Sequence, residues 1–385
     1  MKTILCIYPF QFEAAGFRSR LFPLGRALNR LGYNVVFISV GYGRKPAITT
    51  LTSRIESKSI HQSTKKRTVR IPVELHESLS GLFYFVIGRY FPPIFHLNDL
   101  IVAMNEKCIE VEGVCAVICQ KPFFRTVRLS VLASRLFNVP CILDLDDYDI
   151  SNHARFLSLF DLITVASKTL YDLFSEWEPL LISNAPSDEL LSLVDRRNLP
   201  TANEEVNTIF MYPGTGIPKE NLLAILKALD PSQTLGRLTL VGFPLGFSTD
   251  SLLSISSNRI ELHNTLPHSD VLKLLRRSQL SICVDRDTTY GNAKSSIRLL
   301  ESLASGCAII AWDCGETGRI VKESGAGIAV PFGDAVRLRE AYLKLLSDSS
   351  YRNACSDNAL KCVRSFDSWE TNARKLKNRI LHPYS

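Results

Sequence analysis

A chain of 385 residues exceeds the size at which one hydrophobic core usually keeps growing, so two domains are expected. Apolar residues make up 46% and charged residues 22%, which is ordinary for a soluble globular protein. The longest apolar run is far below the roughly 18 residues that a membrane-spanning helix needs. The first apolar run, residues 3–8, is also too short for a signal peptide. We therefore expect a chain that does not cross a membrane by itself.

The net charge of +7 is unevenly distributed. Residues 1–70 carry 13 Lys and Arg against only Glu13 and Glu56, a balance of +11 that the rest of the chain lowers to +7. A basic first part suits an anionic lipid surface, a phosphorylated substrate or nucleic acid. An ordinary solvated basic surface is the alternative.

The ten cysteines are scattered and include no CxxC pair. Several lie inside apolar runs that read as strands, such as Cys6, Cys141 and Cys283. This pattern predicts buried, reduced thiols and a cytoplasmic location, and it argues against a disulfide framework or a zinc site.

The first part of the chain alternates strands with helical patterns. Leucines at helical spacing predict a helix over residues 18–31, and a second helix is expected over 126–137. Strands are predicted at residues 3–8, 34–40, 114–119, 141–145 and 162–166. Strand–helix–strand units of this length indicate a parallel, doubly wound sheet.

A polar stretch near residues 186–207, which includes Asp195-Arg196-Arg197-Asn198 and Pro200, interrupts this alternation. We place the domain boundary there. The alternation then restarts, with helices expected over residues 219–229, 271–277 and 295–305 and strands over 208–212, 238–241, 260–262, 280–284 and 308–311. The predicted domains are residues 1–190 and 191–365, and we expect the last helix, residues 366–385, to return to the first domain. Two such sheets would point the carboxyl ends of their strands into a shared cleft.

The stretch 291–310 is the most informative for chemistry. Small polar residues precede a helix, and exposed amides at a helix N-terminus form an anion site. Asn292, Ser295 and Ser296 leave room for a phosphate to approach. Glu301 lies about one and a half turns into this helix, where its carboxylate can accept hydrogen bonds from a ribose diol. An ordinary capped helix with a surface glutamate is the alternative.

A second candidate ligand loop joins the first strand to the first helix. Gly16 allows the backbone to approach a ligand closely, and the helix that follows again favours anions. Arg18 and Arg20 follow within one turn and add positive charge. A plain turn is the alternative.

Polar residues also follow two other predicted strands. Gln120-Lys121-Pro122 comes after one, and Asp144, Asp146, Asp147 and Asp149 come at the end of another. Four aspartates in six residues cannot all be buried without partners, so they should face a cleft, a cation or basic side chains. An Asp-x-Asp pair can bind a metal, but the further elements of metal-dependent folds are missing. We favour structural or acceptor-binding roles over metal binding.

Taken together, these elements resemble the retaining glycosyltransferases of family 4, which have the GT-B fold of two Rossmann-like, doubly wound α/β domains facing a central cleft. Residues 301–306, Glu-Ser-Leu-Ala-Ser-Gly, match the second half of the Glu-x7-Glu element of that family. Ser296-Ile297-Arg298 is similar to a variant of the first half, and Ala293 stands where the first Glu is usual. The closing loops around residues 315–327 and the helix start at 366–370 also match, so the resemblance spans nearly the whole chain.

The resemblance implies roles for individual residues. Asp146 occupies the position beside the reacting sugar, and Lys121 is a second candidate for acceptor or sugar contacts. The Gly-x-Val turn of the family corresponds to the turn Asn264-Thr265-Leu266-Pro267. An Arg and a Lys that meet the donor phosphates are expected after residue 212, where this chain has Gly214, Thr215 and Lys219, and Arg298 can replace the missing Arg. The implied residues are: catalytic, Asp146, Lys121 and Arg298; donor-binding, Gly16, Arg20, Gly214, Lys219, Leu266, Asn292, Ser295, Ser296, Ile297 and Glu301.

The resemblance further implies a nucleotide-sugar donor, a lipid-linked or glycan acceptor, and a reaction that requires no metal or cofactor. The aromatic run at residues 82–95 follows a basic stretch, 44–70, and together they suit an anionic membrane surface if they are exposed. If they are buried, they are core and loop. The expected enzyme is therefore a cytoplasmic glycosyltransferase of surface glycan biosynthesis, peripheral on the inner face of the cell membrane.

Other functions remain open at this point. A nucleotide-sugar epimerase shares the fold type but needs further acid–base groups in the cleft, and the seven histidines do not cluster at strand ends. A partner subunit that has lost catalysis is suggested by Ala293 and Thr215. A dinucleotide oxidoreductase is disfavoured because no G-x-G-x-x-G follows a strand. Nucleic-acid binding is disfavoured because the basic residues form no recognisable module.

Overall fold

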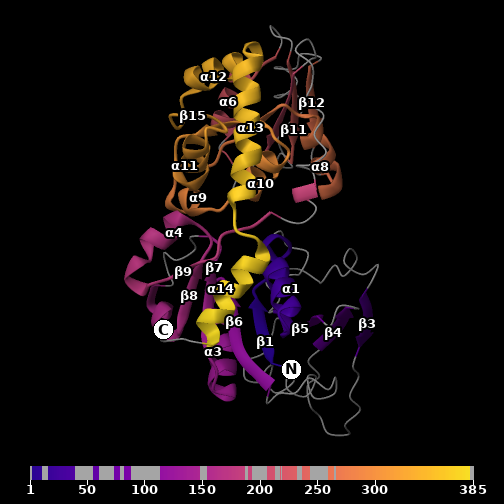
Figure 1. Cartoon of the computed structure of the whole chain (residues 1–385), viewed down its shortest axis with the longest axis vertical. Helices are drawn as coiled ribbons and strands as arrows, with labels where there is room; N and C mark the ends of the chain where they lie inside the picture. The colour runs from indigo at the N-terminus through magenta and orange to yellow at the C-terminus, as the bar shows by residue number, and fades with distance from the viewer. Residues whose placement is uncertain are drawn as a thin grey trace. The chain divides into compact units, whose positions relative to one another are not determined.

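The structure is a computed structural model. It describes residues 2–10, 16–39, 113–147, 154–186, 190–192, 206–212, 217, 219–231, 236–242, 259–263 and 266–381, together with the backbone of three strands at 55–59, 73–78 and 82–87. The chain forms two compact units, the first from residues 1–184 and 368–385 and the second from residues 185–367 (Figure 1). The first unit thus ends six residues before the predicted boundary at 190.

The first unit is built on a nine-stranded sheet in the order β3-β4-β5-β2-β1-β6-β7-β8-β9. The strands from β5 to β9 in this order are parallel, whereas β3 and β4 run antiparallel at one edge. The bounds are β1 Thr3–Tyr8, β2 Asn34–Ser39, β3 Ile55–Ser59, β4 Val73–Ser78, β5 Leu82–Ile87, β6 Val114–Gln120, β7 Cys141–Leu145, β8 Leu162–Val165 and β9 Leu180–Leu181. The predicted strands β1, β2, β6, β7 and β8 are therefore confirmed.

The predicted aromatic membrane segment falls partly on this edge. Residues 82–87 form β5, whose backbone pairs with β2 on one side and β4 on the other. Most of the basic stretch 44–70 and residues 88–95 lie outside the described residues. Within the described part of the chain, no helix is long and apolar enough to cross a membrane.

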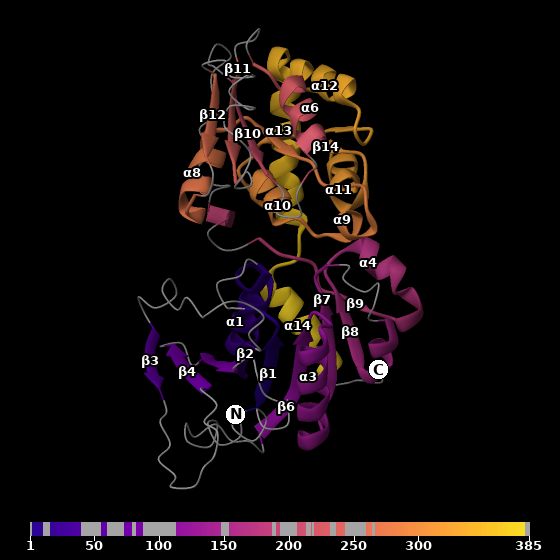
Figure 2. The ribbon, with the colours of Figure 1, turned by 180° about the vertical axis from the view of Figure 1, so that it is seen from behind.

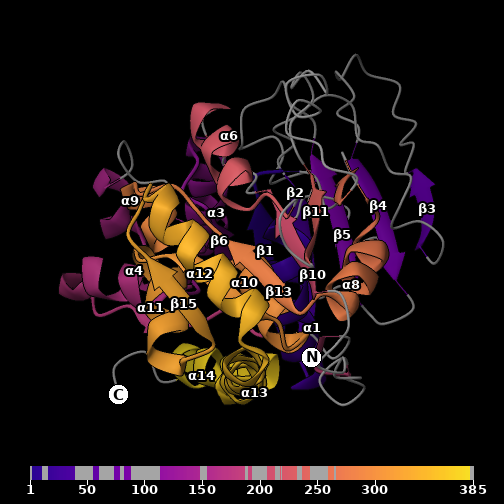
Figure 3. The same cartoon turned by 90° about the horizontal axis from the view of Figure 1, so that it is seen from above.

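Helices cover both faces of the first sheet. The helix α1 (Phe22–Arg30) continues a π-helical turn, η1 (Phe17–Leu21), and lies with α14 (Trp369–Leu381) on one face. The helix α3 (Phe124–Phe137) packs on the opposite face, as Figure 3 shows from above. The short elements are η4 Ala154–Leu159, α4 Lys168–Leu173 and η5 Ser175–Trp177.

The last helix belongs to the first unit. On α14, Trp369, Ala373 and Leu376 are buried, and α14 packs along α1. The Asn372 side chain donates a hydrogen bond to the Ser183 carbonyl, at 2.9 Å. Arg30 of α1 forms an ion pair with Glu370. The final segment thus completes the hydrophobic cover of a sheet that begins at residue 3.

The second unit has a six-stranded, fully parallel sheet in the order β12-β11-β10-β13-β14-β15. The bounds are β10 Val206–Met211, β11 Gly236–Val241, β12 Ile260–His263, β13 Leu280–Cys283, β14 Ala308–Trp312 and β15 Gly327–Val330. The strand order reverses between β10 and β13, and ligands of such sheets bind at the carboxyl ends of the strands beside this reversal. Every strand predicted for this unit is present, and β15 is an addition.

Two apolar cores lie on the two faces of the second sheet. Phe210 and Leu222 belong to the core beneath α6 and α12, while Ile209 and Leu299 belong to the core beneath α8, α10 and α13. Successive residues of β10 thus enter different cores, as the alternation of a strand requires. The helices are α6 Lys219–Ala228, α8 His268–Arg277, α9 Thr289–Ala293, α10 Ile297–Ala304, α11 Gly315–Ser324, α12 Ala335–Ser347 and α13 Ser349–Ser365 (Figure 2).

We predict that Leu376→Ala destabilises the first unit by about 2–5 kcal/mol, because it leaves a cavity between α14 and α1. Hydrogen exchange measured by mass spectrometry should show faster exchange in residues 22–30 and unchanged exchange in α10. Arg374→Ala, at an exposed position of the same helix, is the control. Equal protection of residues 22–30 in both variants would contradict the assignment of α14 to the first unit.

Candidate functional site

In the second unit, an arginine is fixed at the reversal of the strand order. Arg298, in the first turn of α10, donates from Nη2 to Asp285 Oδ1 at 2.6 Å and from Nη1 to the Met211 carbonyl at 3.0 Å. Met211 ends β10, and Asp285 follows β13. The guanidinium is thus held rigidly at the carboxyl ends of the two central strands, where an anionic ligand of this fold type would lie.

The start of α10 is a capped helix N-terminus. Ser296 is the N-cap residue, and its hydroxyl accepts a hydrogen bond from the Leu299 amide at 3.4 Å. Ile297 is therefore the first helical residue, two residues later than predicted. Ser295 precedes the cap and is half-buried. The Ser296 hydroxyl is engaged within the helix, so the backbone amides at the start of α10 are the better donors to an anion.

Glu301 is buried and meets a histidine that the sequence analysis did not identify. Its Oε1 lies 2.7 Å from His268 Nε2, and the side chains are 7% and 57% exposed. His268 is the first residue of α8, directly after the turn at Leu266 and Pro267. The carboxylate and the exposed ring thus form one polar pair between two helices. Leu266, predicted at the donor site, packs against the core beneath α8 and α10.

Asn292 is anchored to a neighbouring loop. Its Nδ2 donates to Asp287 Oδ1 at 2.7 Å, while its Oδ1 is buried without a partner among the described residues. Its backbone packs against Gly315, where a Cβ atom would approach within 2.4 Å and where the φ of +58° favours glycine. Among the other predicted residues, Gly214 lies outside the described residues, and Lys219 begins α6.

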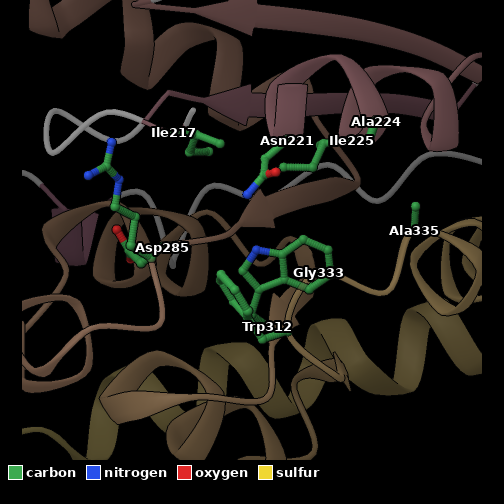
Figure 4. Close-up of a pocket in the computed structure, with 10 residues that line it drawn as sticks. Ile217, Asn221, Ala224, Ile225, Asp285, Trp312, Gly333 and Ala335 are labelled. Atoms are coloured by element: carbon green, nitrogen blue, oxygen red, sulfur yellow. The ribbon is translucent and has the colours of Figure 1, made fainter. Parts of the chain in front are cut away.

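A pocket that is open to solvent lies beside this region in the second unit (Figure 4). Asn221 of α6 and Trp312 at the end of β14 enter it from opposite sides. Phe332 meets the Trp312 ring edge-to-face at 6.0 Å. Asp285, which accepts the hydrogen bond from Arg298, also lines the pocket. Among the predicted donor residues whose side chains the structure describes, none lines this pocket.

In the first unit, four side chains meet at the carboxyl ends of β1, β6 and β7. Lys121 Nζ lies 3.2 Å from Asp146 Oδ1 and 2.6 Å from Asp147 Oδ2. A Cβ atom at Gly16 would lie 3.3 Å from the Tyr8 hydroxyl and 3.4 Å from Asp146 Oδ2. The structure therefore brings the predicted residues Gly16, Lys121 and Asp146 together, and it adds Tyr8.

Two features mark this cluster as a specialised site. Lys121 has a positive φ of 63°, which is uncommon for a residue with a side chain. Burial raises the pKa of Asp146 to about 6, although the Lys121 ammonium opposes the shift and Asp147 adds to it. Burial, together with the Asp146 charge, also raises the pKa of Tyr8. A carboxyl group with a pKa near neutrality is suited to proton exchange or to hydrogen bonding with a hydroxyl ligand.

The prediction that Arg20 binds the donor is wrong. Arg20 is only 1% exposed, because the π-helical turn of η1 directs it into the unit. It donates to both carboxylate oxygens of Asp144, at 2.8 and 2.5 Å, and to the Ile182 carbonyl at 2.7 Å. Arg20 is thus a structural residue that neutralises one of the aspartates.

The aspartates that follow β7 are therefore paired with basic side chains. Asp144 pairs with Arg20, and Asp146 and Asp147 pair with Lys121. In the part of the chain that the structure describes, no group of three or more His, Cys, Asp or Glu is suited to hold a metal ion. The prediction of a reaction without metal or cofactor is not tested by this observation and stays a prediction.

The comparisons with known proteins show the fold and a family match within the second unit. Residues 201–361 match the family model described as glycosyl transferases group 1. The sequence has no match among curated proteins. A glycosyltransferase structure from Rickettsia africae aligns with a TM-score of 0.68 and 15% identity, over 98% of this chain and 97% of that one.

Two further structures align over almost the full chain. The catalytic domain of starch synthase IV from Arabidopsis thaliana, bound to ADP and acarbose, has a TM-score of 0.67 and 12% identity, over 99% of both chains. A protein from Listeria monocytogenes, described as a UDP-N-acetylglucosamine 2-epimerase, has a TM-score of 0.59 and 12% identity, over 100% of this chain and 97% of that one. At these identities the likeness shows the fold.

The two Rossmann-like units therefore constitute a GT-B fold, as the sequence predicted. The family match covers most of the second unit, from before β10 into α13. The second unit thus contains the stretch, residues 201–361, that matches the model of the group 1 glycosyl transferases.

We predict a pH-dependent contribution of Asp146 to stability. Because its folded-state pKa is raised from the ordinary 3.8 to about 6, the protonated form stabilises the fold at low pH, and this contribution is lost as the pH rises through about 6. The free energy of unfolding of Asp146→Asn, relative to wild type, should therefore increase between pH 4 and 7 in urea titrations. Asp172→Asn, at an exposed position, is the control and should show no such trend. A difference that stays constant with pH would refute the raised pKa.

Proposed function

We propose that this glycosyltransferase moves a sugar from a nucleotide-sugar donor to a lipid-linked or polysaccharide acceptor, with retention of the anomeric configuration, in surface glycan biosynthesis. The observation that carries the donor part of this proposal is the pair Arg298 and Glu301 on α10. The Arg298 guanidinium is fixed between the ends of β10 and β13, and the buried Glu301 carboxylate lies about one turn further along α10.

The donor chemistry follows from these groups. A nucleoside diphosphate carries an anionic diphosphate and a ribose diol. The α10 amides and Arg298 suit the diphosphate, and Glu301 suits the diol, because a carboxylate accepts hydrogen bonds from two hydroxyls. The ADP bound to the similar starch synthase IV supports a nucleotide at a site of this fold. Gly214, Lys219, Leu266, Asn292, Ser295, Ser296 and Ile297 remain the proposed further donor contacts.

The proposed reaction is a front-face transfer without a protein nucleophile. The bond between the anomeric carbon and the diphosphate breaks, the acceptor oxygen forms the new bond on the same face, and the acceptor proton passes to a leaving phosphate oxygen. Pre-placed positive groups stabilise the charge that develops on the diphosphate, which is commonly the largest catalytic contribution. Arg298 is the proposed group in this role, and no metal is required.

In the first unit, Asp146 and Lys121 are the proposed contacts to the acceptor or the transferred sugar. Their ion pair lies beside Gly16, where the absence of a side chain leaves space next to the Asp146 carboxylate. The basic N-terminal part of the chain supports an anionic partner, and we propose a peripheral site on the inner face of the cell membrane. Nucleic acid is not a proposed partner.

A partner subunit without catalysis is the second candidate, because Ala293 replaces a family glutamate. Ala293 is fully buried at the end of α9, so a carboxylate on the Cβ of this residue would need a buried partner. The epimerase alternative is distinguished by its product, which is a free altered sugar nucleotide.

We predict that one class of nucleotide, from a panel of UDP, GDP and ADP sugars, raises the melting temperature of the chain. Saturating ligand at about 100 times Kd adds about 2.7 kcal/mol of stability. Glu301→Ala should abolish most of this shift, because the ribose diol loses its acceptor, whereas Glu340→Ala on the exposed face of α12 should retain it.

Three outcomes of this panel are informative. A shift that Glu301→Ala removes supports the donor site and identifies the nucleotide. A shift that persists in Glu301→Ala places the nucleotide elsewhere. If no nucleotide shifts a well-folded wild-type chain, the donor proposal fails.

We further predict that transfer proceeds with retention. With the donor identified by the panel and a simple lipid or sugar acceptor, the anomeric proton of the product should show the coupling constant of the donor configuration in an NMR time course. The Arg298→Met variant should lose at least about 100-fold in rate, the usual size of removing one group that stabilises developing charge. Inverted product would overturn the front-face proposal, and a free epimerised sugar nucleotide would establish the alternative enzyme.

A further inference from the structure

The solvent-facing side of α3 has an unusual composition. The whole helix, Phe-Arg-Thr-Val-Arg-Leu-Ser-Val-Leu-Ala-Ser-Arg-Leu-Phe, contains three arginines and no acidic residue. Its buried face consists of Thr126, Val127, Leu129, Ser130, Ala133 and Ser134, which pack toward β1, β6 and β7. All polar uncharged side chains of α3 are on that buried face. The opposite face is therefore left with arginines and apolar residues alone.

The arginines and apolar residues share one continuous strip. At 100° per residue, Phe124, Arg135, Arg128, Leu132, Arg125 and Leu136 follow one another within about 120° of the helix circumference. Phe124 and Leu136 are 57% and 54% exposed at the two ends of the strip. Arg128 and Arg135 are exposed between them. Figure 2 shows α3 on the outer side of the first sheet, away from α1 and α14.

An ordinary surface helix looks different, and α12 of the second unit provides the comparison. It also exposes apolar side chains, with Val336 at 69%, but these alternate with charges of both signs. Arg337 pairs with Glu340 across one turn, at 2.9 Å. The α12 face thus contains an ion pair of both signs, whereas the α3 helix has no acidic residue.

Exposed arginines interleaved with exposed Phe and Leu are the pattern of a helix that lies in a lipid interface. The apolar side chains enter the boundary between headgroups and acyl chains, and the arginine stems lie along them while the guanidinium groups reach lipid phosphates. A helix of 14 residues is about 21 Å long, so the strip offers a docking surface of that length.

We propose that the α3 strip is the surface by which this glycosyltransferase docks on an anionic phospholipid bilayer. The proposal rests on the membrane-associated part of the function proposed above and names its contact surface. Charge complementarity selects the occupant: every charged side chain of α3 is an arginine, so the partner is anionic, and the exposed apolar ends of the strip require a partner with an apolar interior. An acidic protein and a second copy of this chain are outcomes that the test distinguishes.

The experiment is co-sedimentation of the full chain with vesicles. Pure phosphatidylcholine vesicles are compared with vesicles that contain phosphatidylglycerol as a third of their lipid. Wild type should bind the anionic vesicles and not the neutral ones. Arg128→Glu with Arg135→Glu should lower binding by at least about tenfold, because each basic residue near the surface contributes about as much as a severalfold change in partition. Phe124→Ser with Leu136→Ser should lower the binding that survives at high salt.

The matched control is Val336→Ser with Leu343→Ser, which removes two exposed apolar residues from α12 and should leave vesicle binding unchanged. Circular dichroism checks folding, and Arg128→Gln with Arg135→Gln replaces the charge-reversal pair if the latter unfolds. Nucleotide-induced thermal shifts should be the same in all variants, so failure of vesicle docking is separable from failure of the donor site.

The inference is overturned if the wild-type chain does not co-sediment with anionic vesicles, or if the α3 variants bind these vesicles as well as the wild type does. It is also overturned if wild type forms dimers in solution that the α3 variants lose while vesicle binding is absent, because the strip is then a protein interface. Loss of vesicle binding in both α3 variants, with the α12 variant unaffected, establishes the docking surface.

Discussion

The first unit depends on a buried ion pair. Arg20 and Asp144 are both 1% exposed, and an unpaired charge at either position would cost several kcal/mol. The guanidinium also binds the Ile182 carbonyl and the Asn184 side chain, so it joins the first helical turn, β7 and the segment that leads out of the unit. Because Asp144 is locked on β7, Asp146 two residues later has a fixed direction toward Lys121. The geometry of the candidate acceptor cluster therefore depends on the Arg20–Asp144 ion pair, which is buried away from solvent.

The second unit contains a similar Arg–Asp ion pair whose side chains are less deeply buried. Arg298 and Asp285 also join a helix to the end of a central strand, and they are partly accessible. Arg20 donates to Asp144, Asn184 and the Ile182 carbonyl, whereas Arg298 donates to two partners among the described residues and has five N–H groups. The same Arg–Asp chemistry thus serves stability where it is closed and is suited to an anionic ligand where it lies at the strand reversal.

Periodicity predicted the fold well, because strands and helices are encoded within a few neighbouring residues. Most of the parallel strands of both sheets followed from it, but the strand order did not. Side-chain partners across long separations were not predictable in this way. Arg20 was misassigned because a π-helical turn rotates it inward, and His268 was missed because its partner Glu301 lies 33 residues away. Tyr8 was missed because it ends an apolar strand and reads as core, yet its hydroxyl borders the space above Gly16. The antiparallel strands β3 and β4 were not predicted from the sequence.

The packing around α9 explains how the second unit tolerates alanine where the family pattern has glutamate. Asn292 lies against Gly315, whose positive φ lets α11 begin in direct contact with the α9 backbone. With α9 pressed against α11, residue 293 is fully buried, and a glutamate there would be an uncompensated charge. An alanine removes that cost and keeps the two helices in contact. The polar chemistry that remains nearby is concentrated on α10, where Arg298 is braced by Asp285 and Glu301 by His268. The proposed recognition of the donor therefore depends more heavily on α10 than the two-glutamate pattern requires.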